Sequence, residues 1–157
     1  MKIFSDITAI PDSAKGAVIA IGNFDGVHLG HQALIIEAAK IAQEKGVPLG
    51  VLTFEPHPRR LFQPDQAPGR LTPAAIKAKR LKENHVDALF SLSFDWDFAS
   101  QTAEEFIQNV LKDGLNATHV VVGDNFYFGQ LRKGSAETIK NAGIDISIIE
   151  PIADETK

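Results

Sequence analysis

The sequence predicts an α/β fold in which a mostly parallel sheet lies between two layers of helices. Stretches rich in Val, Ile and Leu alternate with stretches that have the apolar period of helices, giving five strands and four helices. Glycines fall where three of the helices should stop, at Gly46, Gly114 and Gly143. Strands connected through helices run parallel, and helices then cover both faces of the sheet.

The elements follow in chain order. A β-branched run predicts the first strand at 17–23, and an apolar and alanine pattern predicts the first helix at 29–45. The remaining strands are expected at 48–54, 86–92, 119–123 and 144–149, and the remaining helices at 73–84, 103–113 and 135–142. Thr72 before Pro73 is a plausible N-cap, and Thr102 with Glu105 fits a capping box.

One long segment, residues 55–71, carries four prolines and has no clear period. It exceeds the usual length of a connection, and long ordered loops in compact domains often bind ligands. A surface linker without a ligand is the alternative.

Composition narrows the class of protein. The 157 residues suit one domain, and a net charge of -4 argues against a nucleic-acid-binding surface. The absence of cysteine excludes disulfides and thiol catalysis and fits a cytoplasmic protein. Residues 1–16 lack the apolar region of a signal peptide, and no apolar run reaches the roughly 20 residues of a membrane helix.

The segment 22–32, GNFDGVHLGHQ, joins the first strand to the first helix. Gly22, Gly26 and Gly30 let the backbone approach a ligand closely, and free N–H groups at a helix start bind phosphate oxygens. His28 and His31 are one turn apart on the same face of the helix start. The junction therefore predicts a site for a nucleotide triphosphate.

Other interpretations of the two histidines remain open. Each could be solvated or cap the helix, or both could bind zinc, which needs further ligands. Without cysteine, the candidate ligands are Asp25, Glu55, His57 and groups distant in the sequence. Neither a Walker loop nor a G-x-G-x-x-G fingerprint is present at the junction.

Several motifs together resemble one family. Residues 21–32 resemble the HxGH signature of nucleotidylyltransferases, and GNFDGVHLGH resembles the FMN adenylyltransferase module of prokaryotic bifunctional riboflavin kinase/FAD synthetases. LTFEPHPR at 52–59 and VGDNFYFG at 122–129, followed by Arg132 and Gly134, are similar to that family's TFEPHP and VGxxFxFGxxRxG segments. A further match covers Phe94, Asp95, Phe98, Ala99 and 102–106.

The resemblance implies a Rossmann-like three-layer α/β/α nucleotidylyltransferase fold and the transfer of the adenylyl group of ATP to FMN, giving FAD and pyrophosphate. It implies that His28 and His31 stabilise the transition state on the ATP phosphates, and that Asn125 is a catalytic contact between the substrates. The expected ATP-binding residues are Gly22, Asn23, Phe24, Asp25, Gly26, His28, Gly30 and His31. The expected FMN-binding residues are Phe54, Pro56, His57, Pro58, Asp124, Asn125, Phe126 and Phe128.

Each of these aromatic residues could instead belong to the core. Phe126 and Phe128 alternate at strand spacing, which is typical of one packed face. Mg²⁺ is expected with ATP, and it typically takes few protein ligands, so no metal ligand is assigned.

The sequence departs from the family at its end. The Ser/Thr-x-x-Arg signature and the riboflavin kinase domain that the family leads us to expect are absent from residues 1–157. Either the chain is truncated or it is a divergent short homologue. We expect a monomer with no membrane or nucleic-acid partner. The alternatives are an HxGH enzyme with another phosphorylated acceptor, such as nicotinamide mononucleotide or a phosphopantetheine, and a non-catalytic flavin- or nucleotide-binding module.

Overall fold

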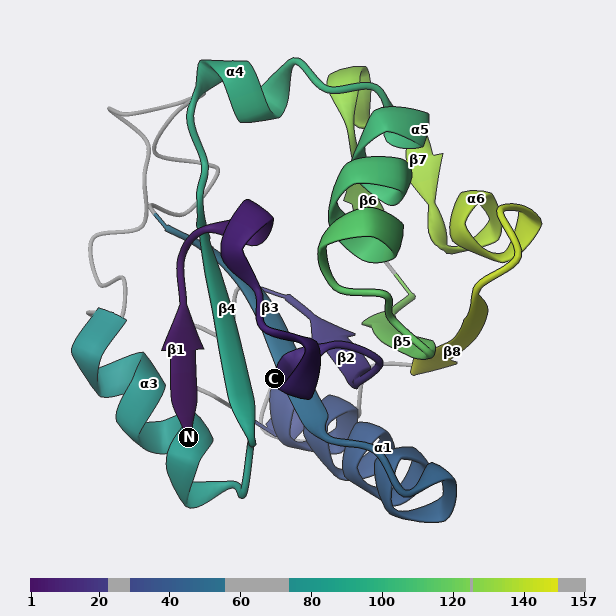
Figure 1. Cartoon of the computed structure of the whole chain (residues 1–157). Helices are drawn as coiled ribbons and strands as arrows, with labels where there is room; N and C mark the ends of the chain where they lie inside the picture. The colour runs from purple at the N-terminus through teal and green to yellow at the C-terminus, as the bar shows by residue number, and fades with distance from the viewer. Residues whose placement is uncertain (23–28, 56–73, 125, 150–157) are drawn as a thin grey trace.

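The computed structural model describes residues 1–22, 29–55, 74–124 and 126–149, and at 29–31, 74, 75, 77 and 131 it describes the backbone alone. Its centre is a sheet of six strands in which every neighbouring pair is parallel (Figure 1). In spatial order the strands are β1 (Lys2–Phe4), β4 (Ala88–Ser93), β3 (Leu49–Glu55), β2 (Val18–Ile21), β5 (His119–Gly123) and β8 (Asp145–Ile149).

From β2 onward, the strand order reverses once, and the reversal lies beside β2. The chain runs outward from β2 through β3 to β4, and then returns to place β5 on the other side of β2. Val18 consequently pairs with Leu49 on one side and with His119 on the other. Ligands in open parallel sheets bind at the carboxyl ends of the strands next to such a reversal, so the β2–β5 boundary is where a site is expected.

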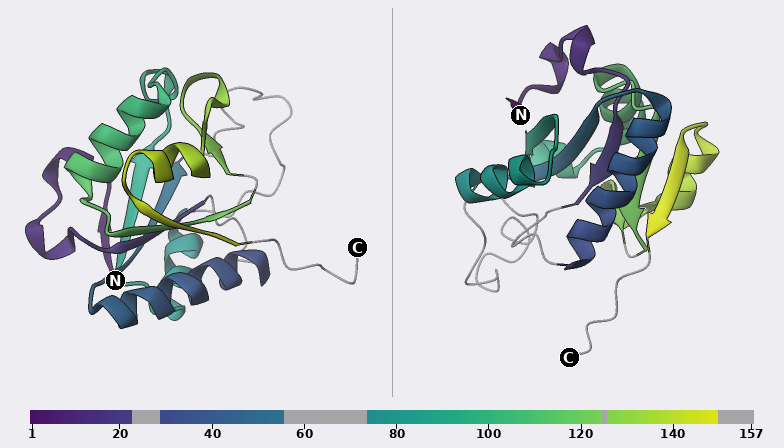
Figure 2. Two further views of the ribbon diagram at one scale, coloured as in Figure 1. Left: turned by 90° about the vertical axis from the view of Figure 1, so that its right-hand side faces the viewer. Right: turned by 90° about the horizontal axis from the view of Figure 1, so that it is seen from below.

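One face of the sheet is covered by α1 (Leu29–Lys45) and α3 (Ala74–Glu83) (Figure 2). Alternate residues of β2, Val18 and Ala20, point to this side and pack with aliphatic side chains of α1. We call this the aliphatic layer; its buried members are Val18, Ala20, Leu34, Ile35, Ala38, Ile41, Ala42, Leu49, Val51, Leu81, Val86, Leu89 and Val121.

The opposite face is covered by shorter pieces, and we call it the aromatic layer because Phe54, Phe90, Phe106 and Phe128 are buried in it. It begins with the 3-10 turns η1 (Ile7–Ala9) and η2 (Asp12–Ala14) and the helical turn α4 (Trp96–Ala99). It continues with α5 (Ala103–Phe106), the π-helical segment η4 (Ile107–Gly114), the hairpin of β6 (Tyr127–Phe128) and β7 (Gly134–Ser135) around η5 (Gln130–Arg132), and α6 (Ala136–Asn141).

The predicted fold class is confirmed, and each of the five expected strands is present within one or two residues where the structure describes it. The expected number of strands was wrong, because β1 adds a sixth to the sheet and β6 and β7 form a second, antiparallel sheet. With three residues, β1 is too short to show an alternating pattern. Its pairing with β4 creates the strand.

The helix predictions also hold where they can be compared. The first helix has the expected bounds, whereas the third is α-helical only to Phe106 and then continues as the π-helical segment to Gly114. Thr102 and Glu105 form the expected capping box. Thr72, Pro73 and the proline-rich residues 56–71 lie outside the described residues. Among the helices that the structure describes, none is both long enough and apolar enough to cross a membrane.

Candidate active site

The ends of three neighbouring strands form the candidate site. β3, β2 and β5 lie side by side, with Ile21 paired to Leu52 and Ala20 to Val121. The Gly22 N–H donates to the Leu52 carbonyl at 3.1 Å, so the β2–β3 pairing continues into the first residue of the GNFDGVHLGH motif. The three motif segments therefore leave the sheet on one side, at the carboxyl ends of β3, β2 and β5, as expected. These ends adjoin the point where the strand order reverses.

The start of α1 lies at the same edge. α1 packs over β2, β5 and β3, and its first turn contains Gly30 and His31. The positive end of the helix dipole and the free N–H groups of that turn are suited to phosphate. Of the expected ATP-binding residues, Gly22 is half-buried at the end of β2. The side chain of His31 lies outside the described residues, as do Asn23, Phe24, Asp25, Gly26 and His28.

On the expected flavin side, the structure describes four of the candidates. Phe54 and Phe128 are each 7% exposed, whereas Phe126 is half-buried and Asp124 is exposed. Two backbone hydrogen bonds hold the turn after β5: the Asp124 N–H donates to the Ile149 carbonyl at 3.2 Å, and the Phe126 N–H donates to the Gly123 carbonyl at 3.2 Å. Pro56, His57, Pro58 and Asn125 lie outside the described residues.

These phenylalanines belong to a row of rings that crosses the aromatic layer. Phe94 and Phe98 each pack on Phe54, with ring centroids 5.8 and 5.5 Å away. Phe98 then contacts Phe106 at 6.0 Å, Phe106 contacts Phe128 at 4.9 Å, and Phe128 stacks on Phe126 at 5.5 Å. The aromatic row, as we call it, consists of Phe94, Phe54, Phe98, Phe106, Phe128 and Phe126.

The row explains both what the sequence indicated and what it missed. Phe54 and Phe128 contact other rings and are buried, so each has the core packing role that the sequence left open as an alternative. Sequence reasoning gave no site role to Phe94, Phe98 or Phe106. The four-residue spacing of Phe94 and Phe98 around a helical turn was the available signal.

The hairpin of β6 and β7 docks against the start of α5. Gly129 has φ +78°, and a Cβ there would lie 2.8 Å from the Ala103 nitrogen. The Gln130 N–H donates to the Gln101 carbonyl at 2.6 Å. Both contacts fix the hairpin to the segment that carries Phe98 and Phe106. On its outer side, the Arg132 guanidinium lies 5.4 Å from the centroid of the exposed Tyr127 ring.

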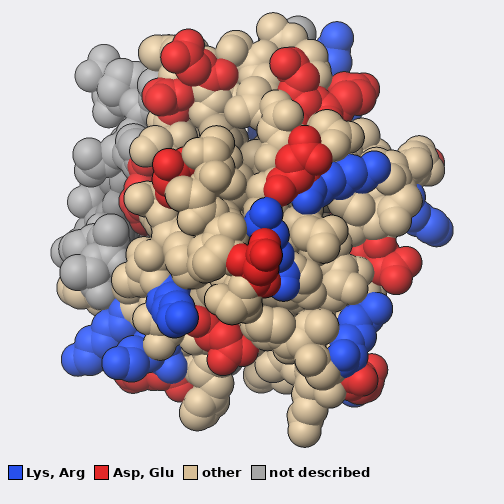
Figure 3. All heavy atoms as spheres, in the orientation of Figure 1, with Lys and Arg blue, Asp and Glu red and all other residues tan. Residues whose placement is uncertain are grey.

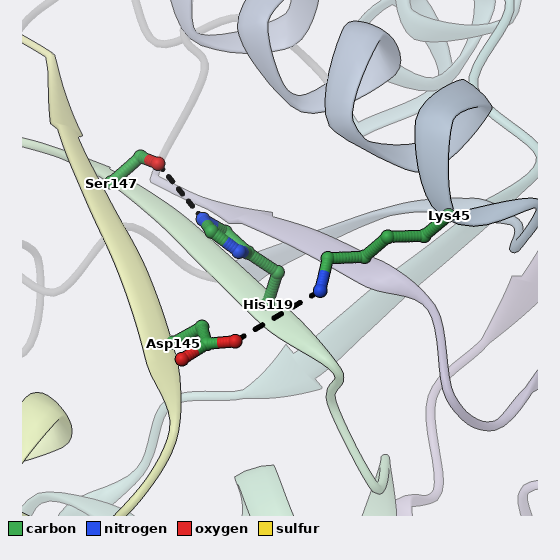
Figure 4. A network of polar contacts seen from close by, with 4 residues as sticks. All are labelled: Lys45, His119, Asp145 and Ser147. Atoms are coloured by element: carbon green, nitrogen blue, oxygen red, sulfur yellow. Dashed lines mark hydrogen bonds and ion pairs between the residues drawn. The ribbon is translucent and has the colours of Figure 1, made fainter.

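A polar cluster lies at the opposite end of the sheet, where β5 begins (Figure 4). His119 Nε2 lies 2.8 Å from Ser147 Oγ on β8, and Lys45 Nζ at the end of α1 lies 3.9 Å from Asp145 Oδ2. His119 Nδ1 is buried and has no hydrogen-bond partner among the described residues. Burial lowers the pKa of His119 and Lys45 lowers it further, whereas Asp145 and Glu37 act in the opposite direction.

Charge is mixed over the face of the molecule drawn in Figure 3. Figure 3 shows acidic side chains over α4 and α5, where Asp97 and Glu104 lie, and basic ones over α3, which carries Arg80 and Lys82. Within the described ranges, no group of three or more His, Cys, Asp or Glu side chains is arranged to hold a metal ion. Of the residues considered for zinc, Glu55 is described, and Asp25, His28 and His57 are not.

Comparison with known proteins assigns the chain to a family. A family model described as FAD synthetase matches residues 10–157. The bifunctional riboflavin kinase/FMN adenylyltransferase of Pseudomonas fluorescens is 44% identical over 145 residues, which is 92% of this chain and 46% of the relative. The protein of the same name from Escherichia coli K12 is 40% identical over 146 residues, covering 92% of this chain and 47% of the relative. The chain thus spans about half the length of these relatives.

Solved structures agree on the fold. A structure described as a macrolide-efflux protein from Streptococcus pneumoniae matches with a TM-score of 0.82 and 30% identity, over 99% of this chain and 52% of that chain. Pantothenate synthetase from Thermus thermophilus matches with a TM-score of 0.63 at 14% identity, over 99% of this chain and 63% of its own, and this likeness concerns the fold alone. With the family model covering all but the first nine residues and curated relatives at 40 to 44% identity, this chain belongs to the FAD synthetase family.

Proposed function

We propose that this chain is an FMN adenylyltransferase domain, which transfers the adenylyl group of ATP to FMN and gives FAD and pyrophosphate. One observation carries the proposal: in a chain of the FAD synthetase family, the three motif-bearing strand ends lie side by side at the reversal of the strand order. This arrangement lets two substrates meet at one edge of the sheet.

In the proposed reaction, a phosphate oxygen of FMN attacks the α-phosphorus of ATP in line. A new P–O bond forms, the bond from the α-phosphorus to the bridging oxygen breaks, and pyrophosphate leaves with that electron pair. The FMN phosphate is already largely ionised near neutral pH, so the step needs no general base. Positioning of the two substrates and stabilisation of charge on the phosphates then supply the catalysis.

On the ATP side, the start of α1 offers N–H groups to the phosphates, and the glycines at 22, 26 and 30 let the backbone close on the nucleotide. His28 and His31 are proposed to donate hydrogen bonds to the phosphates and stabilise the transition state. Asn23, Phe24 and Asp25 are proposed to shape the pocket around the nucleotide.

On the flavin side, burial divides the candidates. Among the described flavin candidates, Asp124 and Phe126 have exposed surface that could contact a ligand, whereas the buried Phe54 and Phe128 are proposed to form a floor beneath it. A floor of aromatic rings suits the flat, mostly apolar isoalloxazine. Asn125 is proposed to contact both substrates, and Pro56, His57 and Pro58 are proposed to line the other side of the flavin.

Mg²⁺ is proposed to enter as the Mg complex of ATP and to take few ligands from the protein. The longer protein to which this domain corresponds is proposed to be a riboflavin kinase as well, because the relatives of about twice the length are named for both activities. A monomeric state and a cytoplasmic location also remain proposals.

Chromatographic detection of FAD after incubation with FMN, ATP and Mg²⁺ tests the function. We expect FAD and pyrophosphate from the wild type, and a rate about 10²- to 10³-fold lower from the His28→Ala/His31→Ala variant, as for loss of an oxyanion donor. His119→Gln, at the far end of the sheet, is the matched control and should retain the rate. Absence of FAD, both from this chain and from a chain extended past residue 157, would refute the proposal.

The same assay separates the alternatives. Turnover with nicotinamide mononucleotide or a phosphopantetheine in place of FMN would indicate an HxGH enzyme with another acceptor. Tight FMN or ATP binding in a calorimeter, without pyrophosphate release even from the extended chain, would indicate a binding module.

A further inference from the structure

Phe98 connects the two halves of the aromatic row. Its ring lies 5.5 Å from Phe54 and 5.6 Å from Phe94 on one side, and 6.0 Å from Phe106 on the other. Among the described rings, Phe98 alone contacts both Phe54, near the end of β3, and Phe106, the last residue of α5, whose ring packs on Phe128 of β6. The distance between these two strand ends therefore depends on its packing.

The backbone holds this ring in place. The Asp95 carboxylate accepts a hydrogen bond from the Phe98 N–H at 2.8 Å and so caps α4. The Phe94 N–H donates to the Glu55 carbonyl at 3.0 Å, which continues the β3–β4 pairing up to α4. Phe98 is thus tied to the end of β3 through the main chain as well as through its ring.

At the other end, the same segment is fixed to the hairpin. Phe106 packs on Phe128 at 4.9 Å, and the Gln101 carbonyl accepts the hydrogen bond from Gln130 at 2.6 Å. Residues 94–106 consequently join the end of β3 to β6. These are the two segments that the proposed function assigns to the flavin.

We propose that Phe98 is a positioning residue for the flavin acceptor. It acts through Phe54 and Phe106, and keeps the ends of β3 and β6 at the separation that the acceptor requires. Phe98 is half-buried and packs against the close-packed core, so a smaller side chain at 98 shifts or loosens its neighbours. The inference rests on the proposed function, and it predicts an effect on FMN that ATP does not share, since ATP is assigned to β2 and α1.

The test uses calorimetric titration of the 157-residue chain with FMN and, separately, with Mg·ATP. We expect Phe98→Leu to raise the Kd for FMN about three- to tenfold, as for loss of an aromatic pair, and to leave the Kd for ATP unchanged. Phe98→Tyr keeps the ring and should restore the wild-type Kd. Phe4→Leu is the matched control, because Phe4 stacks on Phe90 at 5.6 Å in the same layer and, among the described rings, forms no ring pair with the aromatic row.

A second pair of variants tests the backbone support. Asp95→Ala removes the cap that accepts the Phe98 N–H, and it should raise the Kd for FMN by a smaller factor than Phe98→Leu does. Asp95→Asn retains an acceptor oxygen and should leave the Kd for FMN unchanged. An unchanged Kd for FMN in Phe98→Leu, or an equal loss of FMN and ATP affinity, would overturn the positioning role while leaving the proposed function intact. Absence of FMN binding by the wild type, both as this chain and as a chain extended past residue 157, would remove both.

Discussion

The two faces of the sheet differ in composition and in construction. Every phenylalanine that the structure describes packs in the aromatic layer, and the buried side chains of the aliphatic layer are Val, Leu, Ile and Ala. A single helix, α1, covers most of the aliphatic layer, whereas many short pieces cover the aromatic layer. A long helix with one apolar face holds its N-terminus at a fixed position, as the proposed phosphate site requires. A mosaic of short pieces can instead hold several chain segments around a flat ligand.

Truncation of one core side chain on each face should separate stability from flavin binding. Phe106→Ala is expected to lower the free energy of unfolding by about 3–5 kcal/mol, and Leu49→Ala by about 2–5 kcal/mol. Urea unfolding measures both. Where the variants stay folded, only Phe106→Ala should also weaken FMN binding, because Phe106 supports Phe128 and Leu49 lies at the start of β3 under α1. Equal effects on FMN would show that the two faces are not functionally distinct.

Substitution of one glycine next to each layer compares how much the stability of that layer depends on close backbone contacts. Gly129→Ala combines an unfavourable positive φ with a Cβ that would lie 2.8 Å from the Ala103 backbone, and should cost about 2–5 kcal/mol of stability. Gly46→Ala, at the end of α1, has φ +69° but nothing within 4 Å, and should cost about 1–2 kcal/mol. Thermal unfolding of the two variants gives the difference. Similar costs would mean that the hairpin does not depend on its close contact with α5.

The aliphatic side is expected to act on the nucleotide alone. His31→Ala, in the first turn of α1, should slow adenylyl transfer about 100-fold and leave the Kd for FMN nearly unchanged. Lys40→Ala, exposed on the same helix, is the control. Transfer rates and FMN titrations provide the readout, and a comparable loss of FMN binding in His31→Ala would contradict the division between the faces.

The smallest expected effect is the dependence of stability on pH through His119. Burial lowers the pKa of His119 below its ordinary value of 6.5, so between the two pKa values the unfolded chain binds more protons than the folded one. The stability that His119 contributes is present above pH 6.5 and is lost as the pH falls through the folded pKa. Urea unfolding between about pH 7.5 and 5 should therefore show a steeper decline for the wild type than for His119→Gln. Parallel curves for the two proteins would show that His119 does not contribute.

How much could be predicted from sequence also differs between the faces. The apolar pattern over the 17 residues of α1 predicted its bounds, and the runs of Val, Ile and Leu predicted the strands β2, β3, β4, β5 and β8. The pieces of the aromatic layer are held by contacts between residues far apart in the sequence, such as Phe54 with Phe98 and Gly129 with Ala103. No local pattern records these contacts, which is why β1, α4 and the hairpin were not predicted.

The features of the candidate site likewise fall into those that the sequence predicted and those that it did not. The motifs indicated which strand ends would meet, because the carboxyl ends of parallel strands share an edge. The burial of Phe54 and Phe128 and the connecting role of Phe98 depend on tertiary packing, which the motifs do not encode.

The pairing of Val18 with His119 also has a consequence for synthesis on the ribosome. β5 enters the sheet beside β2 only after about a hundred further residues have been made, which takes about 5–20 s at typical rates of translation. During this interval β2 can pair with β3, but its other edge, with the buried side chains of Val18 and Ile19, has no partner strand. Until β5 emerges, the nascent domain therefore exposes an unpaired strand in what will become the middle of its sheet. This interval is when it most needs protection from aggregation.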